Sequence, residues 1–448
     1  MKPSTFHIPH SSFLILLLTL LLGTQTALSQ HLKKQPRINA DGTVTFQFRA
    51  PKAESVILKG SFIPREKSIR TPAGVFGKEG AVEMKREKHV WTYTTVPLES
   101  EIYTYYYEVD GQRCTDQMNP DSVRDVNDYL SYFVVTGGIA DDYVAHDVPH
   151  GKVEKIWYAS SIKDMPRRRM LVYTPPGYDE DNSATYPVLY LLHGSGGDET
   201  SWTQMGHAPQ ILDNLIAAKR CVPMIVVMPN GIADQEAAPG ENPYSDKSAT
   251  ATNIESMFGV IEGAFVPDIV KGYVENHYRV VPDKAHRAIA GLSLGGLHTL
   301  FISANNPDMF DYVGLFSAQT TNALDEKKIT KAEKVAQKLG QLYDLIPSLS
   351  NSKVGNILSG VANTVNDGHL SIYDDLDKKL KQQFQTPPQL YYIALGKDDF
   401  VKKLNDDFRL KLADAGYKYQ YHETDGGHTW ENWRKYLVHF LPQIFNTK

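Results

Sequence analysis

A serine stands two residues from a glycine on either side in the segment 291–295, which has the sequence Gly-Leu-Ser-Leu-Gly. A short apolar run at 288–290 precedes this segment, and a helix-type segment at 297–304 follows it. The two glycines predict a turn so tight that a Cβ atom at either position would clash with the neighbouring strand or helix. The pattern therefore predicts a strand–turn–helix unit that holds the Ser293 hydroxyl at the end of a sheet, beside a helix N-terminus that favours negative charge.

From residue 151 onwards, apolar strand-type segments alternate with helix-type segments. This order is typical of a mostly parallel sheet with helices on both faces. The predicted strands are 169–173, 188–192, 224–228, 287–290, 312–316, 390–395 and 417–423, and the predicted helices are about 208–218, 258–277, 296–304 and 401–415. The segment 321–386 is helical in character and longer than a normal connection, so we predict an inserted helical subdomain there.

The segment 31–137 has a different pattern. Val44, Phe46 and Phe48 alternate with polar residues, and similar short alternating runs follow. Asp110-Gly111 is typical of a hairpin turn, and helix-length periodic segments are absent from this part of the sequence. We therefore predict a small all-β, immunoglobulin-like sandwich over 31–137, joined by a linker at 138–150 to an α/β domain over 151–448.

The first 29 residues have the pattern of a signal peptide. Lys2 gives a weakly basic start, an apolar run covers 13–23, and Ala27-Leu28-Ser29 resembles a cleavage site before Gln30. The apolar run is shorter than the ~20 residues that span a bilayer as a helix, so we predict no transmembrane span in the mature protein. A secreted or periplasmic location is the expectation.

The charge and cysteine pattern limits the classes of partner and cofactor. The formal net charge is only −5, and the short basic run at 167–169 is interpreted as a solvated strand start, so no nucleic-acid partner is expected. Cys114 and Cys221 are expected to be unpaired thiols. A disulfide between them is the alternative, because an exported protein meets an oxidising compartment. No Cys/His cluster is present in the sequence, so we predict neither a metal nor another cofactor.

Serine is a poor nucleophile unless a base takes its proton, and an acceptor must orient that base. His428 follows Gly426-Gly427 and the last predicted strand, which makes it the candidate base. Asp399 follows the preceding predicted strand and is the preferred candidate acid, with Asp398 as the alternative. The order Ser293, acid, His428 is the order found in α/β-hydrolases, and each residue follows a strand, where open α/β sheets place their ligand sites.

A second glycine-rich loop, with the sequence His-Gly-Ser-Gly-Gly-Asp at 193–198, follows another buried strand. The backbone N–H of Ser195 is predicted to join that of Leu294 in an oxyanion hole, the alternative being an ordinary strand-to-helix turn. The loop lacks the lysine of a phosphate-binding loop. His193 is interpreted as a structural residue, and Trp202 and Trp430, close in sequence to this loop and to His428, are candidate substrate-binding residues.

These motifs resemble carbohydrate esterase family 1, in particular bacterial feruloyl and acetyl-xylan esterases with an N-terminal domain similar to a family 48 carbohydrate-binding module. The resemblance is carried by 45–51 and 103–111 in the N-terminal part, and by 168–170, 172–178, 193–202, 228–231, 286–296 and 426–430 in the catalytic part. It implies the triad Ser293, Asp399 and His428 and the oxyanion amides of Ser195 and Leu294. The insertion at 321–386 departs from the family pattern.

The sequence therefore predicts a secreted serine esterase that removes acyl groups from plant cell-wall xylan or its oligosaccharides. We expect feruloyl groups, because the turn-rich segment 232–252 and the insertion are long enough to line a pocket for an aromatic acyl group. Acetyl-xylan, a siderophore-type ester and non-catalytic glycan binding are the alternatives. Sugar binding by the N-terminal part and the oligomeric state are left open.

Overall fold

The computed structural model describes residues 35–446 except 65–68, 72–73, 77–79, 126–127, 163–164, 233–234, 239, 241–262 and 321–374. The predicted signal peptide at 1–29, most of the turn-rich segment 232–252 and the predicted insertion up to residue 374 therefore lie outside the described residues. No helix within the described ranges is long and apolar enough to cross a membrane. Cys114 and Cys221 are free thiols, as expected.

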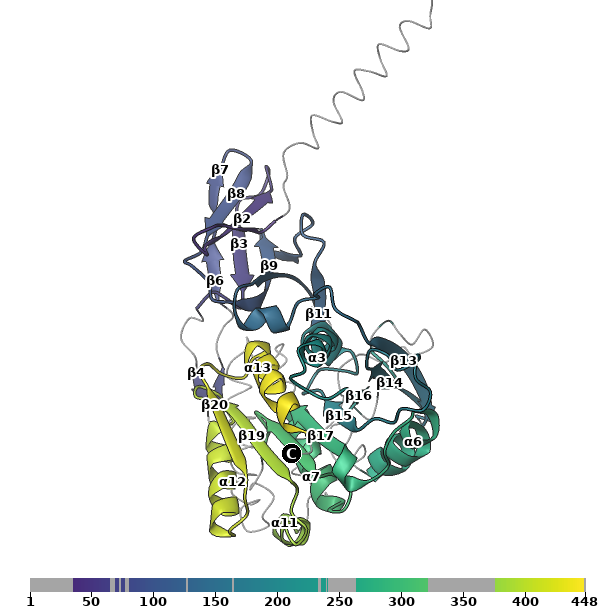
Figure 1. Ribbon diagram of the computed structural model, residues 1–448. Coiled ribbons are helices and arrows are strands. Elements are labelled where there is room, and N and C mark those ends of the chain that lie inside the picture. Colours follow the sequence, from purple (N-terminus) through teal and green to yellow (C-terminus); the bar gives the residue numbers. More distant parts are fainter. Residues whose placement is uncertain are drawn as a thin grey trace, which may run out of the picture.

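An eight-stranded mixed sheet forms the centre of the catalytic part (Figure 1). The six strands β15 to β20 are parallel to one another, whereas β14 is antiparallel to both of its neighbours, β13 and β16. In spatial order they are β13 (Lys152–Ala159), β14 (Arg167–Thr174), β16 (Ile225–Pro229), β15 (Val188–Leu192), β17 (Arg287–Leu292), β18 (Tyr312–Phe316), β19 (Leu390–Gly396) and β20 (Gln420–Thr424). All seven predicted strands are present. The edge strand β13, mostly exposed and charged, was not predicted.

Helices cover both faces of this sheet, which is why β15 to β18 are buried along their whole length. On one face pack α3 (Ala208–Ala217) and α13 (Trp430–Phe440). On the other face pack the π-helix η2 (Phe265–Val274), α7 (Leu294–Asn305), α11 (Leu376–Gln383) and α12 (Lys402–Asp414). The shorter helical segments are α2 (Ser201–Gln204), α6 (Glu275–His277), η3 (Lys284–His286) and η4 (Leu441–Gln443).

The N-terminal part consists of antiparallel sheets. One contains β1 (Arg37–Ile38), β2 (Val44–Arg49), β8 (Val90–Thr94) and β7 (Lys85–Glu87). The other contains β11 (Ser122–Asp125), β12 (Asp128–Val135), β9 (Glu101–Val109), β3 (Val56–Gly60), β6 (Ala81–Glu83) and β10 (Gln112–Cys114). A hairpin is formed by β4 (Ile69–Thr71) and β5 (Gly74–Phe76).

One hydrophobic cluster joins the two larger N-terminal sheets. Phe46 and Trp91 from the first sheet pack in it together with Leu58 and Tyr107 from the second. Asp110 and Gly111 both adopt positive φ and connect β9 to β10, as the hairpin prediction required. The arrangement agrees with an all-β N-terminal part, and its status as an independent immunoglobulin-like domain stays a prediction.

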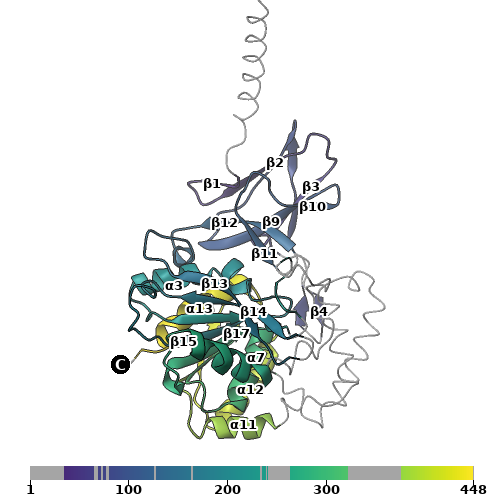
Figure 2. The same cartoon turned by 90° about the vertical axis from the view of Figure 1, so that its right-hand side faces the viewer.

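The segment predicted as a linker packs tightly at the junction of the two parts. It contains the short helix η1 (Ile139–Asp142), and the side chains of Ala140 and Tyr143 are completely buried in the core cluster that includes α3 and α13. Figure 2 shows the N-terminal sheets next to α3, at the end of the molecule away from α11 and α12. The aspartates of 138–150 indicated an exposed segment and gave no sign of this burial.

Candidate active site

Ser293 lies at a strained turn between the central strand β17 and the helix α7. Its φ and ψ are 53° and −114°, a conformation that a non-glycine residue adopts only when its surroundings impose it. A Cβ atom at Gly291 would lie 2.3 Å from the Gly295 carbonyl oxygen, and one at Gly295 would lie 2.4 Å from the His193 carbonyl oxygen. The glycines therefore permit the close approach on which the turn depends, as the sequence predicted.

A continuous chain of hydrogen bonds links Ser293, His428 and Asp399. The Nε2 atom of His428 lies 2.8 Å from the Ser293 Oγ atom. The Nδ1 atom of His428 lies 3.0 Å and 3.2 Å from the two carboxylate oxygens of Asp399. Asp399 is buried, whereas His428 keeps 15% of its side chain exposed. The structure thus brings the three predicted residues together, with a route from solvent to the serine.

The loops after β19 and β20 support each other and set the position of the histidine. The Asp398 N–H donates to the Gly426 carbonyl at 2.9 Å, and the Asn432 side chain donates to the Gly427 carbonyl at 2.8 Å. A Cβ atom at Gly396 would lie 2.3 Å from the Gly426 carbonyl oxygen, so only glycine allows the two loops to meet. Asp398, the alternative acid, is exposed, and Asp399 contacts His428.

Two aromatic rings that were not predicted to belong to the site enclose the imidazole. The ring centres of Phe400 and Trp433 lie 4.3 Å and 5.0 Å from that of His428. Phe400 follows Asp399 directly, and Trp433 lies one helical turn into α13, a helix that was not predicted. These contacts restrict the rotation of the imidazole and hold its Nε2 atom towards Ser293.

The two predicted oxyanion segments meet next to Ser293. Leu294 is the first residue of α7, where backbone N–H groups have no partner within the helix. Ser195 lies in the turn after β15 and is partly exposed. A Cβ atom at Gly194 would lie 3.2 Å from the Ser293 Cβ atom, so the glycine loop passes directly beside the serine. This arrangement is suited to binding a negatively charged oxygen; the role of both amides stays a prediction.

His193 stabilises the loop, in agreement with its interpretation as a structural residue. Its Nδ1 atom lies 2.8 Å from the Gly194 carbonyl oxygen, and its Nε2 atom accepts the Gly231 N–H at 2.7 Å. These partners require a neutral ring that carries its proton on Nδ1. Burial lowers the pKa of His193 to about 4, which keeps the ring neutral near pH 7.

The interpretation of 167–169 as a solvated strand start is wrong for two of its three arginines. Arg168 and Arg169 are buried, and only Arg167 is exposed. Arg168 donates to the carbonyl oxygens of Asn230 and Ile232 at 2.7 Å and 2.8 Å. Because alternate residues of β14 face opposite sides of a covered sheet, both side chains are forced into the interior.

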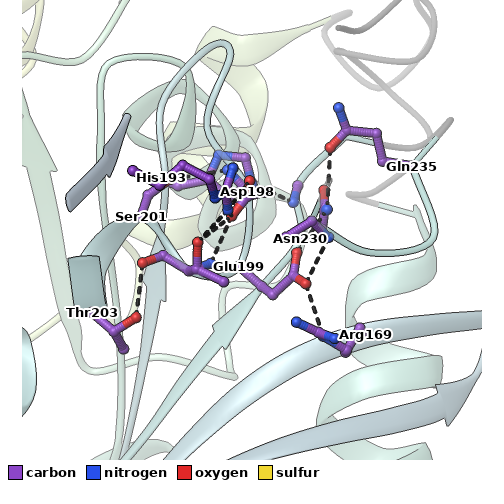
Figure 3. A network of polar contacts seen from close by, with 12 residues as sticks. Arg169, His193, Asp198, Glu199, Ser201, Thr203, Asn230 and Gln235 are labelled. Carbon is purple, nitrogen blue, oxygen red and sulfur yellow. Dashed lines mark hydrogen bonds and ion pairs between the residues drawn. The ribbon is translucent and has the colours of Figure 1, made fainter. Parts of the chain in front are cut away.

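Arg169 pairs with a buried glutamate next to the glycine loop (Figure 3). The Arg169 Nε atom lies 3.0 Å from Glu199 Oε1, and the amide of Asn230 and the N–H of Ala238 also donate to this carboxylate at 2.9 Å and 2.8 Å. Burial, with Asp198 nearby, raises the pKa of Glu199 to about 7. The signal that could have revealed this network is the pair of arginines that opens an otherwise apolar strand.

The two tryptophans proposed as substrate contacts differ in burial. Trp202 has 1% of its surface exposed, and its indole N–H donates to the Leu192 carbonyl at 3.0 Å, so it supports the loop from below. Trp430 is partly exposed and packs edge-to-face on Trp202 at 5.3 Å and on Trp433 at 5.2 Å. Of the two, only Trp430 offers surface near the site.

A comparison with family models matches residues 163–444 to the family described as "Putative esterase". The chain belongs to this esterase family. The match covers the central strands from β14 onwards, the serine turn and the loops after β19 and β20. The predicted resemblance to esterases is confirmed, whereas its carbohydrate-binding-module part stays a prediction.

Two curated relatives and one solved structure illustrate the similarity. The chain is 32% identical over 301 residues to an endo-1,4-beta-xylanase/feruloyl esterase of Xylanibacter ruminicola, with 64% of this chain and 36% of the relative covered. It is 26% identical over 260 residues to an acetyl esterase of Caldicellulosiruptor saccharolyticus, with 57% and 82% covered. The chain thus spans about a third of the first relative's length.

The enterobactin esterase FES of Shigella flexneri shares the fold at 16% identity and a TM-score of 0.56. The superposition covers 92% of this chain and 96% of that structure. At this identity the likeness concerns the fold alone, and its coverage extends beyond the part matched by the esterase family model.

Proposed function

We propose that this protein is a serine esterase that hydrolyses ester-linked acyl groups, feruloyl in the first place, of plant cell-wall xylan or its oligosaccharides. The observation that carries the proposal is the hydrogen-bond chain from Ser293 through His428 to the buried Asp399, at a turn whose backbone is strained. Such a chain activates a hydroxyl group for attack on a carbonyl carbon.

In the first half of the reaction, Ser293 Oγ attacks the ester carbonyl while its proton passes to His428 Nε2. Asp399 keeps the other proton of the imidazole on Nδ1 and stabilises the imidazolium that forms. The carbonyl oxygen becomes an oxyanion, which the N–H groups of Leu294 and Ser195 stabilise. His428 then protonates the alkoxide of the sugar as the bond from carbon to that oxygen breaks, which leaves an acyl-enzyme.

In the second half, a water molecule attacks the acyl carbon and gives its proton to His428. The second tetrahedral intermediate collapses, the proton returns to Ser293 Oγ, and the carboxylic acid leaves. The serine, the imidazole and the carboxylate end in their starting protonation states. No group outside the chain takes part except water, so the cycle balances with ester and water consumed, and acid and alcohol formed.

The choice of substrate is supported by the relatives and by the predicted exported form. The relative from Xylanibacter ruminicola bears the name of a xylanase and feruloyl esterase, and that from Caldicellulosiruptor saccharolyticus the name of an acetyl esterase. Export by the predicted signal peptide at 1–29 places the protein where plant polysaccharide is found. A polysaccharide-binding role for the N-terminal sheets belongs to the same proposal.

Two measurements test the proposal. Ser293→Ala is expected to fold normally and to lower kcat on aryl esters by several orders of magnitude, about 10⁶ when a catalytic serine is removed in a well-studied protease. Hydrolysis by this variant at the wild-type rate would rule out the mechanism. Release of ferulate and acetate from xylan fragments is then compared, and faster release of acetate would reverse the acyl preference.

A further inference from the structure

An arginine of the N-terminal sheets reaches the end of the glycine loop. Arg124 belongs to β11, and its Nη2 atom lies 2.9 Å and 2.7 Å from the two carboxylate oxygens of Asp198. The same nitrogen donates to Thr200 Oγ1 at 2.6 Å. Only 11% of the Arg124 side chain and 4% of that of Asp198 are exposed. The pair is therefore nearly dry, and the loss of one partner leaves a buried charge.

Asp198 fixes the C-terminal end of the loop that carries Ser195. Its Oδ1 atom accepts the N–H and the hydroxyl of Thr200 at 2.9 Å and 2.7 Å, and its own N–H donates to Ser201 Oγ at 3.0 Å. Figure 3 shows Asp198 beside His193, which fixes the other end of the loop. The residues between them include three glycines, whose backbone has no side chains to restrain it. The loop conformation therefore depends on its two ends.

Asp198 and Glu199, which are neighbours near the end of this loop, each form an ion pair with a different arginine. Glu199 pairs with Arg169 from within the catalytic part, and Asp198 pairs with Arg124 from the N-terminal part. Without Arg124, the buried carboxylate of Asp198 would lose its arginine partner, and its repulsion with the neighbouring Glu199 would be offset less. The repulsion is relieved if Asp198 moves towards solvent, and such a movement displaces the loop that adjoins Ser293.

Arg124 is not required to attach the N-terminal part. A second buried pair joins Glu101 of β9 to Arg434 of α13, with their atoms 3.0 Å apart. Val123 and Leu130 also pack with Met205, the residue that follows α2. The Glu101–Arg434 pair lies on other elements than Arg124, and the apolar contact does not involve the Arg124 side chain. Substitution of Arg124 is therefore expected to change the loop and to leave the junction in place.

We propose that Arg124 is a positioning residue for ester hydrolysis, which holds Asp198 so that the Ser195 N–H stays directed at the oxyanion. The inference rests on the proposed function, because it presumes that Ser293 is acylated and that Ser195 stabilises the oxyanion. In this role the N-terminal sheets contribute a residue that positions the active site, whether or not they also bind sugar.

The test compares Arg124→Gln with Arg113→Gln in the full-length protein. Arg113 lies on β10 of the same sheet and forms an exposed ion pair with Asp128, so its loss is a matched control. Arg124→Gln is expected to lower kcat on aryl esters at least tenfold with KM within a factor of about three, which is less than the roughly 10²–10³ lost with a complete oxyanion donor. Arg113→Gln is expected to keep both constants.

Inhibition by an arylboronic acid separates positioning from a purely structural role. The boronate forms a tetrahedral adduct on the serine and places one oxygen in the oxyanion hole. In Arg124→Gln its inhibition constant is expected to rise by about the same factor as kcat falls. Arg124→Lys, which keeps the charge and loses the planar fork, is expected to lie between Arg124→Gln and the wild type. An unchanged inhibition constant alongside reduced kcat would overturn the inference.

The coupling between the two partners gives an independent readout. If Arg124 acts through Asp198, Arg124→Gln combined with Asp198→Asn lowers kcat no further than the more damaging single substitution. Multiplying effects would contradict this route. Wild-type kcat in Arg124→Gln, together with loss of activity in Ser293→Ala, would reject the positioning role and leave the proposed function standing. Activity retained in Ser293→Ala would reject both.

Discussion

His428 Nδ1 lies 3.0 Å from a carboxylate oxygen of Asp399, whereas Asp398, one residue earlier in the chain, is exposed. The difference arises from the turn after β19, in which the Asp399 N–H donates to the Gly396 carbonyl and the Asp399 carboxylate accepts the Val401 N–H. A one-residue shift of this turn would exchange the two side chains. The turn therefore decides which aspartate orients the imidazole.

Asp399→Asn is expected to lower kcat by about 10³–10⁴, because an amide stabilises the imidazolium poorly and allows the wrong tautomer. The measurement is kcat on an aryl ester at pH 7–8, with thermal unfolding to verify the fold. Asp398→Asn is the matched control and is expected to stay within about twofold of the wild type. If Asp398→Asn proved the more damaging of the two, the assignment of the acid would be reversed.

Substitution of Trp202 is expected to affect mainly stability, and substitution of Trp430 mainly substrate binding. Trp202→Ala removes a fully buried side chain and is expected to cost about 3–5 kcal/mol of unfolding free energy. Trp430→Ala is expected to have a smaller effect on stability and to raise KM severalfold for feruloylated oligosaccharides, because this ring is partly exposed near His428. Urea unfolding and steady-state kinetics on both variants check the pair.

An unchanged KM in Trp430→Ala, with normal folding, would remove Trp430 from the substrate-binding residues. Trp430→Phe serves as the conservative control, since it keeps an apolar ring for packing on Trp202 and Trp433. Its KM is expected to lie closer to that of the wild type than to that of the alanine variant.

The sequence was sufficient to predict seven of the eight strands of the central sheet and the meeting of Ser293, Asp399 and His428. Strands of a parallel sheet that is covered on both faces appear as separate apolar runs, and their carboxyl ends lie along one edge. Residues directly after those runs therefore converge, however far apart they lie in the chain. Glycines at 291, 295 and 426 added the turn geometry that places the side chains.

The junction could not be predicted in the same way. Tyr143 and Arg434 carry no local pattern that distinguishes a surface position from a buried one, and their burial depends on how two separately patterned segments pack. Arg168 and Arg169 were misinterpreted for the same reason, because a charged run indicates solvent unless the partner carboxylate is known. Glu199, which pairs with Arg169, and Asn230, whose carbonyl oxygen accepts from Arg168, are distant in sequence.

Arg434→Met is expected to cost about 3–5 kcal/mol of unfolding free energy, because it leaves the Glu101 carboxylate buried without its main partner. Lys435→Met is the control. Lys435 approaches the same glutamate at 3.8 Å but is about one-third exposed, so its loss is expected to cost at most about 1 kcal/mol. The measurement is urea unfolding of both variants. Equal stability losses would show that the buried pair does not hold the junction.

The free energy of unfolding is expected to fall on acidification, because histidines that are buried in the neutral form resist protonation in the folded state. Burial lowers the pKa of His207 in the folded state to about 4, whereas an unfolded histidine has a pKa near 6.5. The unfolded state therefore binds more protons between these values, and the stabilising contribution that is complete above pH 6.5 is lost as the pH falls towards 4. His193 contributes with the same sign, and Glu199, whose pKa is raised, contributes with the opposite sign below pH 7.

His207→Asn isolates one of these contributions. His207 has a positive φ of 50°, which asparagine tolerates, and an amide can replace the ring nitrogen that contacts the Tyr143 carbonyl at 3.2 Å. The variant keeps the contributions of His193 and Glu199 and loses the titration of residue 207. Its unfolding free energy, measured in urea at pH 7.5, 6 and 5, is expected to decline less steeply than that of the wild type, with a difference that grows on acidification towards about 3 kcal/mol at pH 4. Parallel curves would show that residue 207 does not titrate differently in the folded and unfolded states.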